Sequence, residues 1–114
     1  MLKANFITAQ EAAEKIQDGS TLCTIGMTLV SASESILKAI EKRFETVGHP
    51  ADITLVHSCG QSDRKDGIQH LAHEGLVKRI IGSHWGLQPR WMEMIANSQV
   101  EAYCLPQGQI AQLY

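Results

Sequence analysis

The residue with the strongest potential for chemistry in this sequence is an amide, Gln107. It stands between Pro106 and Gly108, where a predicted strand leads into a predicted helix. A primary amide at such a junction can donate a hydrogen bond to an oxyanion or hold a carboxylate. Polar residues also serve as ordinary turn residues, so the sequence leaves both interpretations of Gln107 open.

Histidines provide a second set of candidates. His84, next to Trp85 in a glycine-bounded loop, can titrate near neutral pH and act as an acid or base. The sequence supplies no partner that would orient its ring, and a purely structural role is the alternative.

A metal site is a further alternative around His70, His73 and Glu74, which fall on one predicted short helix. A tight site needs three or four converging ligands, and the additional ones would have to come from His57 or Cys59. We expect a hydrogen-bonded helical surface here and no metal.

Other functional classes lack their signatures. The chain has no G-x-S-x-G, G-x-G-x-x-G or P-loop motif. Its net charge of −2 argues against a nucleic-acid surface. No apolar run approaches the roughly 20 residues that span a bilayer. We therefore expect neither a nucleic-acid partner nor a membrane.

Three widely spaced cysteines without a C-x-x-C pair do not form a disulfide framework. They favour a reducing, cytoplasmic location, and the first ten residues have no signal-peptide pattern. Cys23 and Cys104 lie in apolar runs, where a thiol behaves as a small hydrophobe.

The elements that position these residues alternate along the chain, and its 114 residues predict a single domain, residues 1–114. Helix starts are marked by a capping box at Thr8 and Glu11, by the same spacing at Ser31 and Glu34, and by Pro89. Residues 61–67 are predicted to be an exposed loop. Strands are predicted at 21–25, 53–57, 77–81 and 101–104, and helices at 8–18, 31–48, through 71–72, at 89–97 and from 109.

This alternation predicts an α/β fold, a mainly parallel sheet with helices on both faces. Each predicted strand ends in a loop that contains glycine, and ligands of such sheets bind beyond the carboxyl ends of the strands. The sequence therefore predicts a binding site at this edge, although glycine is also needed simply to make tight turns.

Five strings in the chain are shared with a known family: residues 7–13, 39–44, 72–79, 82–86, and 101–103 followed by 106–108. They resemble the N-terminal portion of family I coenzyme A (CoA) transferases of the acetate or propionate type, over nearly the whole chain. The resemblance implies a CoA-transferase-like α/β fold of which this chain is a truncated, N-terminal part.

The resemblance also implies a reaction. Members of the family move CoA between a short-chain acyl-CoA, such as acetyl- or propionyl-CoA, and a free carboxylate, through a glutamyl-CoA thioester. The nucleophilic glutamate belongs to the C-terminal half of the family chain, and no glutamate here matches its motif. We therefore expect no catalytic residue in this chain, a CoA thioester as substrate, no covalently bound cofactor, and the C-terminal part of the transferase as partner.

Site residues follow from the same resemblance. Gln107 matches a glutamine that lines the active site opposite the nucleophile, with Gly108 and His84 beside it. The first strand-end loop is assigned to substrate or CoA contacts, although it keeps only the first glycine of the family pattern; its residues are Gly26, Met27, Thr28, Leu29 and Val30.

A non-catalytic module that binds acyl-CoA or a protein partner through the same loops is the alternative function. A shortened sheet leaves an unpaired edge and uncovered apolar surface, so we expect self-association into a homo-oligomer. The transferase interpretation requires a parallel sheet with the Gln107 amide at the same edge as Gly26.

Overall fold

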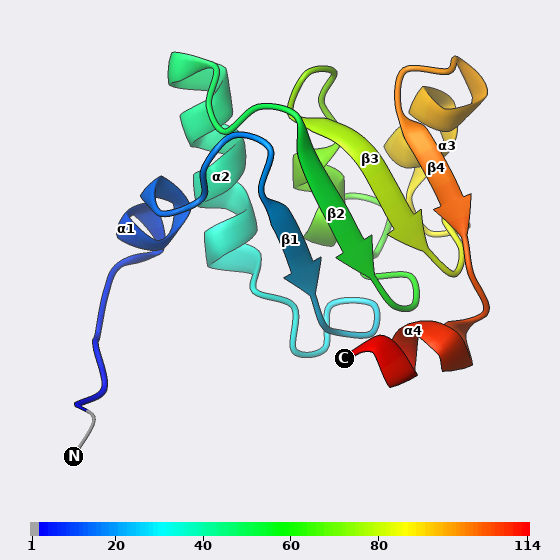
Figure 1. The fold of residues 1–114 in the computed structure, drawn as a ribbon, viewed down its shortest axis with the longest axis horizontal. Helices are drawn as coiled ribbons and strands as arrows, with labels where there is room; N and C mark the ends of the chain where they lie inside the picture. The colour runs from blue at the N-terminus through cyan, green and yellow to red at the C-terminus, as the bar shows by residue number, and fades with distance from the viewer. Residues whose placement is uncertain (1–2) are drawn as a thin grey trace.

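The chain forms four strands that alternate with helices (Figure 1). A computed structural model describes residues 3–114. The elements are α1 Ala9–Glu14, β1 Thr21–Thr24, α2 Glu34–Val47, β2 Ile53–His57, the 3₁₀-helix η1 Gly67–Leu71, β3 Val77–Gly82, α3 Pro89–Ala96, β4 Glu101–Cys104 and α4 Gln107–Leu113.

All strand pairs are parallel, and the sheet order is β1-β2-β3-β4, so the predicted parallel α/β fold is confirmed. The register aligns one row of apolar side chains that packs against the helices: Leu22, Leu55, Ile80 and Ala102. Because side chains alternate across a strand, this row fixes which face of the sheet is the core face. Trp91 and Ile40 close the core from α3 and α2, and both are fully buried.

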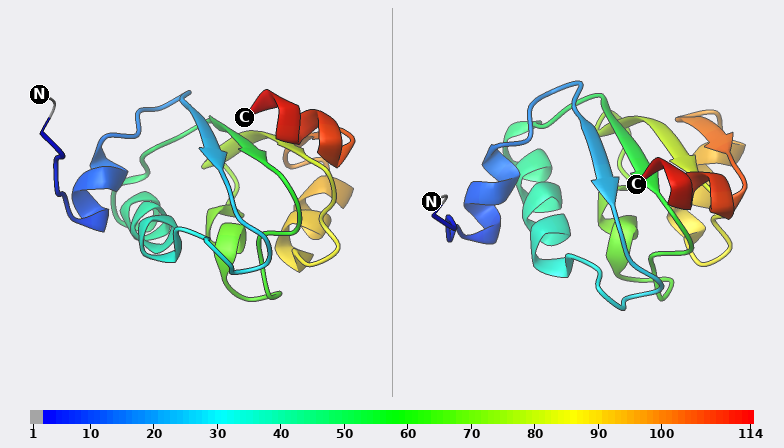
Figure 2. Two further views of the ribbon diagram at one scale, coloured as in Figure 1. Left: turned by 90° about the horizontal axis from the view of Figure 1, so that it is seen from below. Right: turned by 60° about the horizontal axis from the view of Figure 1, so that its bottom comes forward.

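Most helices pack against one face of the sheet, and the other face is covered in part by α4, so helices flank the sheet as predicted. Figure 2 shows α1, α2, η1 and α3 on one side of the strands, and α4 on the other side at their carboxyl ends. The opposite face carries the row Cys23, Val56, Ile81 and Tyr103. The thiols of Cys23 and Cys104 are exposed, although both residues lie in apolar runs of the sequence.

The first helix start is confirmed and the second is wrong. Thr8 accepts a hydrogen bond from the Glu11 amide at 3.1 Å, and the Glu11 carboxylate accepts from the Thr8 amide at 2.7 Å. The second helix begins at Glu34, and Ser33 is its N-cap without a side-chain bond. Glu34 does not reach back to Ser31, because its carboxylate accepts a hydrogen bond from the Gly67 amide instead, at 2.9 Å.

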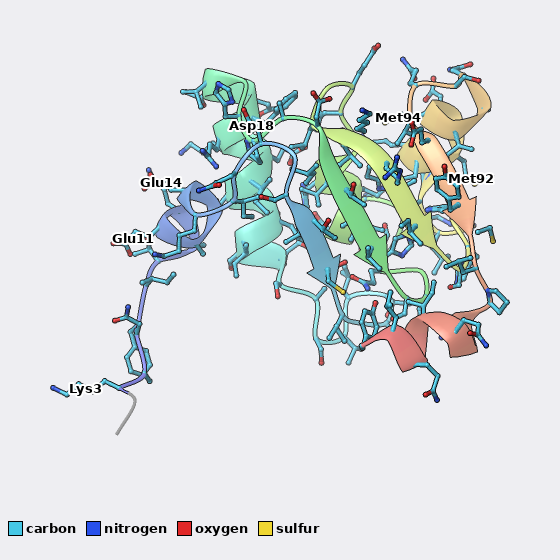
Figure 3. All side chains as sticks on the ribbon, viewed as in Figure 1. Lys3, Glu11, Glu14, Asp18, Met92 and Met94 are labelled. Atoms are coloured by element: carbon cyan, nitrogen blue, oxygen red, sulfur yellow. The ribbon has the colours of Figure 1, made fainter. Side chains whose placement is uncertain are left out.

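The prediction of an exposed loop at residues 61–67 fails, since Gln61 and Ser62 are buried. On α3, Met92 is 52% exposed, whereas Met94 is buried, because the two side chains leave the helix on different sides (Figure 3). Among the described residues, every helix is too short or too polar to cross a membrane.

Candidate functional site

The carboxyl ends of the four strands meet at one edge of the sheet, where α4 crosses beneath them (Figures 1 and 2). Loops that are far apart in sequence are joined there. The Thr28 amide donates to the Gly60 carbonyl at 2.9 Å, which ties the loop after β1 to the loop after β2. The Tyr114 hydroxyl donates to the Thr24 carbonyl at 3.0 Å, which brings the end of α4 to the end of β1.

Gln107 lies at this edge and connects two further loops. Its Nε2 donates to Cys59 Sγ at 3.2 Å, and its Oε1 accepts from Ser83 Oγ at 3.1 Å. The amide is therefore on the same edge as Gly26, as the transferase interpretation requires. Gln107 is the first residue of α4, so the last helix begins two residues earlier than residue 109, the predicted start.

The loop after β1 is a tight turn with an apolar surface. Met27 and Val30 pair by two backbone hydrogen bonds of 3.1 and 2.8 Å. Gly26 has φ +155°, and a Cβ there would lie 3.0 Å from the Val30 carbonyl oxygen, so this position favours glycine. The side chains of Met27, Leu29 and Val30 are exposed, and the assignment of this loop to substrate or CoA contacts stays a prediction.

His84 and Gly108 are also at this edge. The His84 side chain lies over Gly60, where a Cβ would be 2.8 Å from its Cε1 atom. Gly108 follows Gln107 in the first turn of α4, and a Cβ there would meet nothing within 4 Å. Their assignment to the active-site lining stays a prediction.

His57 is buried beneath the carboxyl edge. The sequence suggested it only as a possible metal ligand. Burial lowers the pKa of His57, so the ring is neutral. Its Nδ1 lies 3.0 Å from the carbonyl oxygen of Cys59, and in the tautomer that carries the proton on Nδ1 this nitrogen donates a hydrogen bond to that oxygen. Its Nε2 has no partner among the described residues and faces Gly82, where a Cβ would lie 2.3 Å away. The edge of Trp85 packs against the ring, with centroids 6.1 Å apart.

Gln61, like His57, lies at this edge but was not predicted from the sequence to be part of the site. Its side-chain amide donates to the Thr24 carbonyl at 2.8 Å and to the Ser58 carbonyl at 3.1 Å, and so joins the end of β1 to the loop after β2. The side chain is 1% exposed. No local pattern marks it, because its neighbours in sequence are polar and its partners lie up to 37 residues away.

The predicted set of His70, His73 and Glu74 does not converge. The 3₁₀-helix ends at Leu71, so His73 and Glu74 follow it. Glu74 accepts from Gln99 at 3.2 Å, whereas His73 pairs with Glu41 at 2.8 Å. Among residues 3–114, potential ligand atoms do gather in two other groups: Glu34, Asp66 and His70, and Glu41, Glu45 and His73.

All members of these two groups except Glu45 take part in ion pairs among the described residues. His70 and Lys38 both pair with Glu34 and Asp66, and His73 pairs with Glu41. Neither His57 nor Cys59 takes part, because both lie at the carboxyl edge. We assign no metal to either group.

Comparison with known proteins places the chain in context. The family model for coenzyme A transferase matches residues 6–114. The chain is 36% identical over 112 residues to a caffeate CoA-transferase of Acetobacterium woodii, covering 97% of this chain and 21% of that protein. It is 34% identical over 108 residues to the acetate CoA-transferase YdiF of Escherichia coli K12, covering 93% of this chain and 20% of that protein.

Solved structures agree with these sequence matches. The acyl-CoA transferase YdiF of E. coli O157:H7, in a thioester complex with CoA, superposes with a TM-score of 0.83 at 33% identity, over 90% of this chain and 21% of that one. Its apoenzyme gives a TM-score of 0.84 over 90% and 20%. The chain thus spans about a fifth of the length of these relatives.

Proposed function

Because the chain belongs to the coenzyme A transferase family, we propose that it forms the N-terminal part of an acyl-CoA:carboxylate CoA-transferase. Its substrates in this proposal are a short-chain acyl-CoA, such as acetyl- or propionyl-CoA, and a free carboxylate. Residues 1–114 contribute the first part of one α/β domain, and the nucleophilic glutamate comes from outside them. The three free thiols favour a reducing, cytoplasmic compartment for the reaction.

The position of Gln107 carries this proposal. A primary amide has two N–H donors, and Cys59 Sγ takes one of them. Within residues 3–114 the second has no acceptor, which leaves it to donate to an oxyanion at the carboxyl edge. The hydrogen bond from Ser83 to Oε1 fixes the orientation of the amide, so that both N–H groups point away from Ser83. A pre-oriented donor is what stabilises charge that develops on a thioester oxygen.

The proposed reaction is ping-pong. The glutamate carboxylate attacks the acyl-CoA carbonyl, the C–S bond breaks, and an acyl-glutamyl anhydride and CoA thiolate form. The thiolate then attacks the glutamyl carbonyl, which releases the first carboxylate and leaves the glutamyl-CoA thioester. A second carboxylate reverses these steps and leaves as the new acyl-CoA. Each attack places negative charge on a carbonyl oxygen, which the Gln107 amide would stabilise.

A chimera tests the proposal. Residues 6–114 would replace the corresponding fifth of the E. coli acetate CoA-transferase, and transfer of CoA from acetyl-CoA to propionate would be measured. We expect turnover and a hydroxylamine-sensitive glutamyl-CoA adduct. Gln107→Ala should lower kcat by roughly 10²–10³, the usual effect of losing one oxyanion donor.

Gln99→Ala is the matched control, because Gln99 is an exposed glutamine that contacts Glu74, remote from Gln107. If the chimera turns over and Gln107→Ala has the same kcat as Gln99→Ala, Gln107 has no role in the reaction. Micromolar binding of acyl-CoA by the chimera, measured by calorimetry, with no adduct and no turnover would favour the non-catalytic binding module instead.

The partly covered face of the sheet favours association with further protein. Tyr103 on this face is 51% exposed and Cys23 is also exposed, whereas Val56 is only 6% exposed. β1 and β4 are both edge strands with unpaired backbone groups. We propose that the isolated chain self-associates through these surfaces. A monomer in sedimentation at all concentrations would contradict this, and Tyr103→Lys should shift the equilibrium towards monomer.

A further inference from the structure

His70 lies between two carboxylates of α2, remote from the candidate site. Its Nδ1 is 2.5 Å from Glu41 Oε2, and its Nε2 is 2.6 Å from Glu34 Oε1. The side chain is only 12% exposed. Both distances are shorter than the roughly 2.7–2.9 Å usual for hydrogen bonds between a cationic nitrogen and a carboxylate.

The two contacts fix the protonation state of the ring. A neutral imidazole carries one N–H, so one of its nitrogens would present a lone pair to a carboxylate. Two carboxylate partners require two N–H donors, which only the imidazolium has. The surroundings are net acidic: Asp66 lies 3.3 Å from Nε2, Lys38 pairs with Glu34 and Asp66, and His73 and Arg90 approach Glu41.

We propose that His70 is a positioning residue that stays an imidazolium throughout the neutral pH range, and that it clamps the 61–71 segment to α2. We call His70, Glu34 and Glu41 the clamp. Through Gln61, the clamp holds the ends of β1 and β2 in place. The functional part of this inference rests on the proposed function, whereas the charge state of His70 does not.

A continuous series of contacts connects the clamp to the site. Glu34 Oε2 accepts from the Gly67 amide at 2.9 Å. Gly67 packs so closely on Gln61 that a Cβ there would be 2.0 Å from the Gln61 carbonyl oxygen. The Ile68 amide donates to that same carbonyl at 2.9 Å, and the Gln61 side chain then reaches Thr24 and Ser58.

The pKa directions agree with this geometry. Burial alone would lower the pKa of His70, but the hydrogen bonds that its ring donates to Glu41 and Glu34 outweigh burial and raise the pKa. Burial alone would raise the pKa values of Glu34 and Glu41, but hydrogen bonds to the carboxylates outweigh burial and lower both pKa values. The donors are Gly67 and His70 for Glu34, and His73 and His70 for Glu41. The clamp is therefore intact between the lowered pKa values of the carboxyls and the raised pKa of the imidazole.

Nitrogen-15 NMR of the histidine rings tests the charge state in the chain itself. At pH 7.5 both ring nitrogens of His70 should carry protons and show imidazolium shifts. His49 provides an internal comparison, because it also pairs with a carboxylate, Asp18, but only through Nδ1 and with 55% of its side chain exposed. A neutral His70 ring at pH 7.5, with one protonated nitrogen, would overturn the proposal.

Hydrogen exchange tests the positioning role. His70→Gln should lower the protection of the Gly67 and Ile68 amides at least about tenfold, since hydrogen bonds to charged groups are the strong ones. His49→Gln should leave both amides unchanged. Unchanged protection in folded His70→Gln would contradict the clamp, and if that variant does not fold, the wild-type ring spectrum still decides. CoA takes part in neither measurement, so failure here is distinct from failure of the transferase proposal.

Discussion

The two regions around His57 and His70 show how one residue type takes opposite charge states in one small fold. His57 lies beneath the carboxyl edge between Gly82 and Trp85, and its Nδ1 lies 3.0 Å from the carbonyl of Cys59, a neutral partner. His70 lies between carboxylates. Burial opposes charge in both places, but only the carboxylates around His70 are strong enough to outweigh it. The charge of each histidine is therefore set by its partners and not by burial alone.

The largest effect is expected where the backbone of the His70 region is tightest. Gly67 has φ +76°, and its Cβ would collide with the Gln61 carbonyl at 2.0 Å. Gly67→Ala should lower the free energy of unfolding by about 3–4 kcal/mol, from left-handed strain plus overpacking. Gly48 has φ +74°, and a Cβ there would meet no atom within 4 Å. Gly48→Ala should therefore lower the free energy of unfolding only by the backbone strain, about 1–2 kcal/mol. Urea unfolding measures both, and equal losses would show that the packing of Gly67 on Gln61 is unimportant.

A smaller effect is expected in the His57 region, where a side chain rather than backbone is in the way. A Cβ at Gly82 would lie 2.3 Å from His57 Nε2, so Gly82→Ala should cost about 1–3 kcal/mol by overpacking. Gly86 is the control, because its Cβ would meet its nearest atom at 3.9 Å, and Gly86→Ala should change stability by less than about 0.5 kcal/mol. If Gly82→Ala is tolerated as well as the control, His57 is free to move and its region is not tightly packed.

The smallest effects, and the most specific, are the opposite pH dependences of the two histidines. The pKa of His57 is lowered in the folded chain, so the unfolded chain takes up a proton first on acidification. The contribution of neutral His57 to the free energy of unfolding is complete above the ordinary pKa near 6.5, and it is lost as the pH falls towards the lowered pKa. His70 has a raised pKa, so its contribution is complete below 6.5 and is lost as the pH rises through that raised value.

Unfolding free energies measured from pH 5 to pH 9 for the wild type, His57→Gln and His70→Gln separate the two contributions. The difference between wild type and His57→Gln should grow in favour of the wild type as the pH rises from 5 to 7.5. The difference in unfolding free energy between the wild type and His70→Gln should shrink as the pH rises towards 9. The same sign for both variants would remove the contrast between the two regions.

The order of the elements and the parallel sheet could be predicted from the amino-acid sequence alone. Apolar spacing, β-branched runs and glycine stops act over a few neighbouring residues, and such local signals are readable in any one segment. They also placed Gly26 and Gln107 at the ends of strands, and hence at one edge of the sheet. The strings shared with CoA-transferases added the family, which the family model confirms.

Only the tertiary structure decided which side chains meet. Glu34 fits a second capping box by spacing, yet its carboxylate binds Gly67 and His70, which follow it by 33 and 36 residues. Gln61 lies in a polar stretch and is nevertheless buried against Thr24 and Ser58. A side chain's partners depend on how distant elements pack, and that information is absent from the local pattern around either residue. The same limit applies to the sheet, whose alternating apolar rows do not reveal which face most of the helices cover.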